Sequence, residues 1–126
     1  MIMMLSRVEF EQLVVQALDE LPDFIHKKMT NVEVLIEPWP NRRQMFGIEL
    51  PQGHTLLGLY HGVPLTERSS FYALVSPDTI TLYQGPIEQA AGSQDRVIAV
   101  VRRTVVHEVA HHFGISDDRL RELGAY

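Results

Sequence analysis

The segment from Gln94 to Phe113 restricts the fold more than any other part of the chain. Its many valines favour a strand by intrinsic propensity, but its length and periodicity favour a helix. At about 100° per residue, one broad side of that helix collects the apolar residues Val97, Ile98, Val101, Val105, Val106, Val109 and Phe113. The other side collects the polar residues Arg103, Thr104, His107, Glu108 and His111. We therefore expect a long helix that packs its apolar face on a sheet, turns its polar stripe outward and ends at Gly114, a natural left-handed cap.

The N-terminal part of the chain predicts two more helices. Ser6 and Glu9 form a capping-box pair, and Leu5 and Phe10 are spaced to act as a hydrophobic staple. They begin a helix whose apolar positions keep helical spacing and which ends near Pro22. Since proline is favoured in the first turn of a helix, a short second helical turn is expected after it, through about residue 28.

The remaining segments predict strands and loops. Apolar and acidic residues alternate over 32–37, which indicates a strand with one buried and one solvated face, ended by the Pro38-Trp39-Pro40 run. We predict further strands near 45–50, 56–60 and 79–83, and a loop from Gln84 to Ser93, which contains Gly85, Pro86 and Gly92. The expected fold class is α+β: a small mixed β-sheet packed on an N-terminal helix and a long C-terminal helix.

Composition excludes several functional classes. A chain of 126 residues that is 45% hydrophobic and 21% charged fits a single domain over 1–126. The net charge of −5 gives no basic footprint for nucleic acid, so no nucleic-acid partner is expected. The absence of cysteine excludes a disulfide framework, a thiolate nucleophile and an iron–sulfur cluster, so any metal must be bound by nitrogen and oxygen. Without a signal-peptide pattern or a membrane-spanning apolar stretch, we expect a cytoplasmic protein that does not contact membranes.

The polar stripe of the C-terminal helix carries an H-E-x-x-H pattern, His107-Glu108-Val109-Ala110-His111. Residues four apart lie on one helix face, so both imidazoles can converge on a single cation. Glu108 is then placed as a general base that takes a proton from a zinc-bound water and passes it to the leaving amine. The competing interpretation is that these residues are only the solvated face of an amphipathic helix.

The sequence after the second histidine extends the pattern to H-E-x-x-H-x-x-G-x-x-D. Gly114 lies where the helix must stop and the chain must turn back, and Asp117 falls where a third ligand is expected. Asp118 is an alternative third ligand. His112 is rotated toward the helix flank and is interpreted as a cap-region donor, and Glu122 as an exposed residue of a short terminal helix over 117–123.

The extended motif resembles the zincin metallopeptidases, and more closely a small bacterial zincin-like family of minimal, matrix-metalloprotease-like proteins. The resemblance covers most of the chain: residues 10–22, 31–32, 57–65, 77–83 and 103–108. It implies a zincin-like fold in which His107, His111 and Asp117 match the ligand positions and Glu108 matches the base. Position 117 differs from the larger metzincins, whose third ligand is His.

A few residues outside the motif have two interpretations each. Tyr60, His61 and Tyr83 are candidates for the electrophile that stabilises a tetrahedral oxyanion, but packing and turn roles are the simpler interpretation. Trp39, between two prolines, is interpreted as an anchor of its loop on the core rather than a substrate platform.

We therefore predict a zinc-dependent metallopeptidase with about one Zn²⁺ per chain, which hydrolyses a peptide or protein substrate lying beside an edge strand, residues 79–83. The alternative is a non-catalytic zinc-binding module that acts in protein interaction. A metal-dependent nuclease is a third hypothesis, which Glu108 and the acidic charge balance disfavour. Fe(II), Co(II) and Mn(II) also suit two imidazoles and a carboxylate. The substrate and the oligomeric state are left open.

Overall fold

The structure is a computed structural model, and it describes residues 4–41, 43, 56–62 and 77–124. Its helices are α1 (Arg7–Asp19), α2 (Asp23–Lys28), α4 (Gln84–Ala91), η3 (Gln94–Arg96, a single 3₁₀ turn), α5 (Val97–His112) and α6 (Asp117–Glu122). Its strands are β1 (Val32–Glu37), β2 (Gly58–His61) and β3 (Asp78–Tyr83). The α+β class predicted from the sequence is confirmed. The strand predicted near 45–50 lies outside the described residues.

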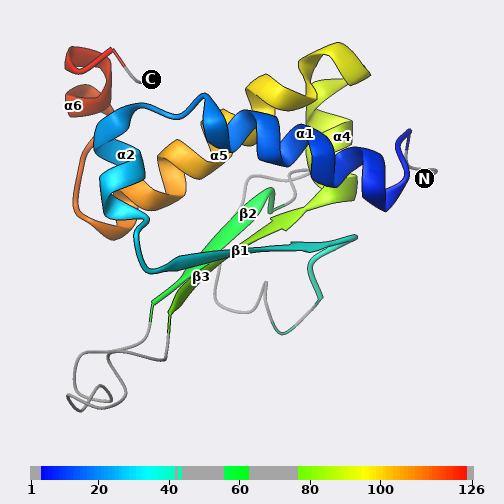
Figure 1. The fold of residues 1–126 in the computed structure, drawn as a ribbon, viewed down its shortest axis with the longest axis horizontal. Coiled ribbons are helices and arrows are strands. Elements are labelled where there is room, and N and C mark those ends of the chain that lie inside the picture. The colour runs from blue at the N-terminus through cyan, green and yellow to red at the C-terminus, as the bar shows by residue number, and fades with distance from the viewer. Residues whose placement is uncertain (1–3, 42, 44–55, 63–76, 125–126) are drawn as a thin grey trace.

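The strands form a mixed sheet in the order β1-β3-β2 (Figure 1). β1 runs parallel to β3, with Val32 opposite Asp78, and β2 runs antiparallel to β3, with Tyr60 opposite Ile80. The prediction that residues 79–83 form the edge strand beside a substrate is therefore wrong, because β3 is paired on both sides. Among the strands that the structure describes, β2 is the edge strand that faces α5. The sequence could not show this, since strand order depends on contacts between distant segments.

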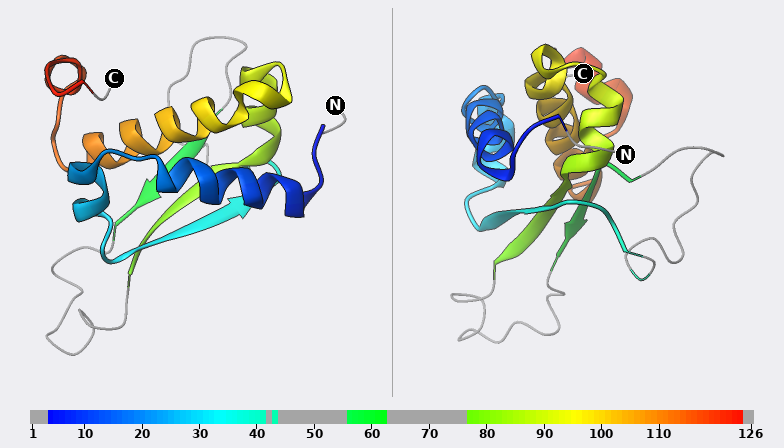
Figure 2. Two further views of the ribbon diagram at one scale, coloured as in Figure 1. Left: turned by 45° about the horizontal axis from the view of Figure 1, so that its top comes forward. Right: turned by 90° about the vertical axis from the view of Figure 1, so that its right-hand side faces the viewer.

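The helices cover one face of the sheet, where α1 and α5 lie side by side (Figure 2). Phe10, Val14 and Ala17 of α1 are buried, and so are Ile80 and Leu82 of β3. From α5 the buried apolar side chains are Val97, Val101, Val105, Val106, Val109 and Ala110. The capping box at Ser6 and Glu9 begins α1 as predicted.

None of the helices in the described ranges combines the length and apolar character that crossing a membrane requires.

The loop predicted over 84–93 is wrong, because residues 84–91 form helix α4 directly after β3. Pro86 lies in the first turn of α4, where a missing N–H is tolerated. Gly92 ends the helix with a φ of 75° and donates its N–H to the carbonyl oxygen of Glu88. Gly85, Pro86 and Gly92 therefore mark the start and stop of a helix rather than a loop.

The polar stripe of α5 does not simply face outward, which corrects a second prediction. α5 packs most extensively on α1, and Thr104 and Glu108 of its polar stripe contact the edge strand β2. Thr104 is buried there, with its hydroxyl donating to the carbonyl oxygen of Val100 at 2.8 Å. Phe113, placed on the apolar side by periodicity, is 44% exposed. α5 lies between a sheet edge and a second helix, so two of its sides are buried. Dividing its residues by periodicity into one apolar and one polar side therefore misplaces those at the boundary.

Candidate functional site

The chain reversal after α5 is built from local hydrogen bonds. Gly114 has a φ of 75° and donates its N–H to the carbonyl oxygen of His111, while Ile115 donates to that of Ala110. These two bonds form a Schellman motif, which satisfies the last carbonyl groups of the helix. Ser116 then caps α6 by accepting the N–H of Arg119 at 3.1 Å. The left-handed cap predicted at Gly114 and the short terminal helix are both confirmed.

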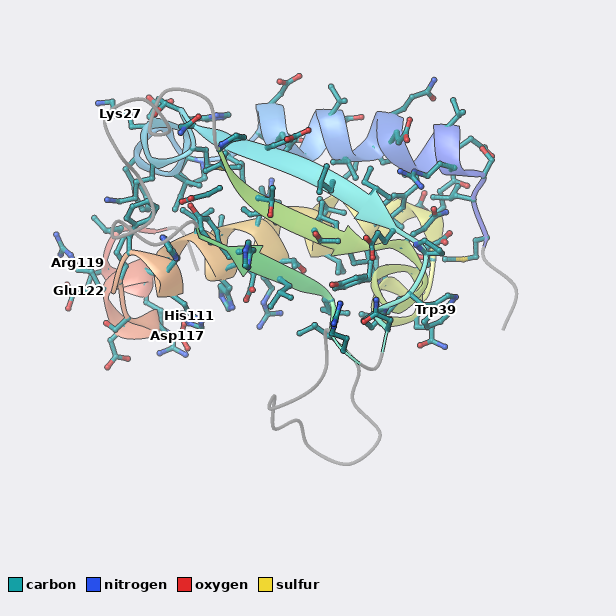
Figure 3. The ribbon with its side chains drawn as sticks, turned by 90° about the horizontal axis from the view of Figure 1, so that it is seen from below. Lys27, Trp39, His111, Asp117, Arg119 and Glu122 are labelled. Carbon is teal, nitrogen blue, oxygen red and sulfur yellow. The ribbon has the colours of Figure 1, made fainter. Side chains whose placement is uncertain are left out.

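This reversal brings Asp117 back to the histidine stripe. Oδ1 of Asp117 lies 3.3 Å from Nε2 of His111. One turn earlier on α5, the ring of His107 has its centroid 6.0 Å from that of His111, with 33° between the ring planes. Figure 3 shows His111 and Asp117 close together near the end of α5, far from Trp39. The structure therefore places the three residues predicted as ligands at one end of the fold.

Glu108 lies on the side of α5 that faces β2. Its Oε1 accepts the backbone N–H of Tyr60 at 3.2 Å. Leu57 accepts the N–H of Tyr83, and pairs that exchange hydrogen bonds alternate along an antiparallel ladder. It follows that Leu59 and His61 turn their backbone groups toward β3, while Gly58 and Tyr60 turn theirs toward the outer edge. The carboxylate of Glu108 is thus held at the outer edge of the sheet.

Burial shifts the pKa of two of these groups. Burial raises the pKa of Glu108 above 4.5, although the hydrogen bond from Tyr60 and the charge of His111 act the other way. Burial also lowers the pKa of His107 below 6.5, against the opposing charge of Asp117. A carboxylate with a raised pKa is a better general base near neutral pH, and a neutral imidazole keeps a lone pair available for a metal.

A cavity of about 440 Å³ opens beside Glu108 and His107. Its remaining walls come from β2 and the residues before it, from α4 and from the preceding turns of α5: Leu56, Leu57, Gly58, Ala90, Val100, Arg103 and Thr104. The apolar walls with a few polar groups at one end are typical of a pocket that takes an organic ligand.

The donor set has the right chemistry for zinc, since imidazole nitrogen and carboxylate oxygen are its usual ligands in a cysteine-free site. The 3.3 Å contact between His111 and Asp117 supports this fit. Within the described ranges, no three His, Asp or Glu side chains are already arranged so that they could hold an ion. The ligand set therefore remains a prediction.

The other candidate residues near the site pair with residues outside the set of His107, His111 and Asp117. Asp118 pairs with Arg121 at 3.0 Å, and Glu122 pairs with Arg119 at 2.9 Å on the exposed face of α6 (Figure 3). His112 stacks on the ring of Tyr60, with 3.9 Å between the ring centroids. It therefore contacts β2, which differs from the cap-region role predicted for it.

The side chains proposed as an electrophile have other contacts or are buried. The hydroxyl of Tyr60 donates to Oδ2 of Asp78 at 2.7 Å, and the side chain of His61, one residue along the strand, lies on the other face of the sheet. Tyr83 is fully buried. Sequence reasoning missed the role of Tyr60, because the group that contacts Glu108 is a backbone N–H, which every residue except proline carries.

Trp39 packs its ring directly against Gly85, which agrees with an anchor of its loop on α4.

Comparisons with known proteins agree with the motif. The family model of zincin-like metallopeptidases matches residues 29–125. A solved structure of a conserved hypothetical protein from Thermus thermophilus is similar, with a TM-score of 0.54 and 28% sequence identity over 86% of this chain and 94% of that one. No curated protein matches the chain. The chain belongs to the zincin-like metallopeptidase family.

Proposed function

We propose that this protein is a zinc-dependent peptidase in which His107, His111 and Asp117 bind the metal and Glu108 is the general base. The observation that carries the proposal is the position of Glu108. Its carboxylate is held by Tyr60 at the outer edge of β2, it follows His107 directly in the chain, and it lines the cavity beside α5. An edge strand, a base and a pocket are thus adjacent, as hydrolysis of an extended peptide requires.

The proposed ligand residues would hold the ion at the end of α5. Bound zinc would supply a Lewis acid that makes a water molecule more acidic and polarises the substrate carbonyl. His107 and His111 would each offer a ring nitrogen, and Asp117 a carboxylate oxygen. The contact between His111 and Asp117 supports this assignment, because it already joins two of the three groups.

The chemistry assigned to Glu108 is proton transfer. Its carboxylate accepts a proton from the attacking water, whose oxygen forms a bond to the peptide carbonyl carbon. When the carbon–nitrogen bond breaks, the same proton passes to the leaving amine. The raised pKa of Glu108 supports its role as the proton acceptor, since burial makes its carboxylate more basic than an exposed one.

The substrate is placed along β2 rather than β3. The backbone groups of Gly58 turn toward the outer edge of β2, where an extended peptide could add as a further strand next to the Tyr60 N–H that holds Glu108. Side chains that alternate along such a peptide would reach the cavity beside Val100 and Thr104. The apolar walls of this cavity favour an apolar side chain.

The test uses zinc-loaded wild-type protein and the Glu108→Gln variant, each incubated with a peptide library that is analysed by mass spectrometry. Gln keeps an oxygen that can accept the N–H of Tyr60, so the fold and the metal are expected to persist while hydrolysis is lost. Zinc content measured on both samples controls for metal loss. Equal cleavage by the two proteins, or no cleavage by fully zinc-loaded wild type, would overturn the proposal.

A further inference from the structure

The C-terminal end of α5 is joined to β2 by a cluster of aromatic side chains. The rings of His112 and Tyr60 stack with centroids 3.9 Å apart and planes 20° apart. Phe113 meets both rings edge-on, at 6.4 Å from Tyr60 and 4.9 Å from His112. Nζ of Lys28, from α2, lies 4.8 Å from the centroid of Phe113. Helix and strand are therefore held together beside the candidate site.

The ring of Tyr60 is also fixed at its far end. Its hydroxyl donates to Oδ2 of Asp78 at 2.7 Å, and Nε2 of His112 lies 3.8 Å from the same oxygen. Gly62 touches the ring of His112 so closely that a Cβ there would lie 2.7 Å from Cε1. The residue after β2 thus lies directly on the ring of His112, and a larger side chain there would displace that ring.

The same tyrosine binds the proposed base through its backbone. Glu108 accepts the N–H of Tyr60 at 3.2 Å, and His112 follows Glu108 by one helical turn on α5. One turn of α5 therefore contacts Tyr60 twice, at the backbone through Glu108 and at the ring through His112. Because the ring and the N–H belong to one residue, the stack on His112 restrains the part of β2 that presents this N–H to Glu108.

We propose that His112 and the Tyr60 side chain are positioning residues for Glu108: their stack fixes the Tyr60 N–H, and that N–H fixes the carboxylate. His112 then serves the site without binding the metal. The inference rests on the general-base role proposed above for Glu108. The hydrogen bond itself is measurable without any substrate.

The matched variants are His112→Ala, which removes the stack, His112→Leu, which keeps apolar volume without an aromatic face, and His112→Phe, which keeps a ring for Tyr60. Backbone amide exchange is followed by NMR at Tyr60, with Leu59 and His61 as internal controls because their N–H groups face β3. Circular dichroism and thermal unfolding show whether each variant is folded.

In His112→Ala and His112→Leu, exchange at Tyr60 is expected to accelerate about tenfold relative to the two controls, since loosening one charged hydrogen bond is worth about 1.4 kcal/mol or more. His112→Phe is expected to restore the wild-type ratio. An unchanged ratio at Tyr60 in the folded Ala or Leu variant would overturn the proposal. Equal acceleration of all three amides would also overturn it, because that result indicates general loosening of β2.

A second readout uses any peptide that the wild type cleaves. Misplacing a catalytic group affects the chemical step, so His112→Ala should lower kcat about tenfold or more with little change in KM, and His112→Phe should recover most of it. A loss confined to KM contradicts a positioning role. Because amide exchange needs no substrate, the absence of peptidase activity would refute the proposed function while the amide data still decide whether His112 positions Glu108.

Discussion

The carboxylate of Asp117 lies 3.3 Å from the imidazole of His111, although the helix that carries His111 ends between them. The contact exists because Gly114 adopts a left-handed conformation and Ser116 caps the next helix. Asp117 then occupies the first turn of α6, directed back at α5. A helix stop, a cap and a carboxylate at fixed spacing thus bring two of the three proposed metal ligands together from local sequence.

Gly114→Ala should weaken zinc binding by straining this reversal. A Cβ at Gly114 meets nothing within 4 Å, so the cost comes from its φ of 75° and is expected to be about 1 kcal/mol of unfolding free energy. Gly124→Ala is the matched control, with a φ of 74° and equally open surroundings after α6. Competition with a chromophoric chelator should show reduced zinc affinity for the first variant alone. Equal zinc affinities for both variants would show that the conformation of the chain reversal does not affect metal binding.

The two neighbouring aspartates should behave differently. Asp117→Asn removes the charge beside His111 and should reduce zinc affinity by about tenfold or more. Asp118→Asn only breaks an exposed pair with Arg121, which is worth at most about 1 kcal/mol, and should leave zinc affinity unchanged. Calorimetric titration of both variants with zinc measures the difference. The reverse order of affinities would assign the third ligand to Asp118.

Tyr83→Phe should change alkaline stability and leave hydrolysis intact. The Tyr83 hydroxyl is buried without a hydrogen-bond partner among the described residues, so its removal costs little at neutral pH. Burial, with the charges of Glu37 and Glu108, raises the pKa of Tyr83 from 10.0 to about 12. The unfolded chain then loses this proton first, so wild-type stability falls relative to the variant as pH rises from 10 toward 12. Urea unfolding at pH 7, 10 and 11 tests this, and a large loss of peptidase activity in the variant would instead indicate a role for the hydroxyl in the reaction.

Features with local causes could be predicted from the sequence. The capping box at Ser6, the left-handed Gly114 and the spacing of His107 and His111 each depend on residues a few positions apart. Such signals specify helix ends and helix faces directly. The helix α4 was missed because Gly85, Pro86 and Gly92 are also typical of loops, and only the packing of Ile87, Glu88 and Ala91 decides between the two.

Features with long-range causes could not be predicted. The central position of β3 depends on parallel pairing with β1 and antiparallel pairing with β2, which no local pattern specifies. The hydrogen bond between Tyr60 and Glu108 joins residues 48 positions apart and uses a backbone group. The stack of His112 on Tyr60 likewise follows from how α5 lies on β2. The motif therefore predicts a base and ligands, and the fold shows what surrounds these residues.

Zinc content tests the central claim most directly. Wild-type protein and the His111→Ala variant are purified without tag or added metal, and the metal is measured by inductively coupled plasma mass spectrometry. We predict about one zinc ion per wild-type chain and a large loss in the variant, because His111 is the proposed ligand that contacts Asp117. A wild-type protein that lacks zinc and fails to bind added zinc, or a variant that keeps its full zinc content, would contradict the proposed site.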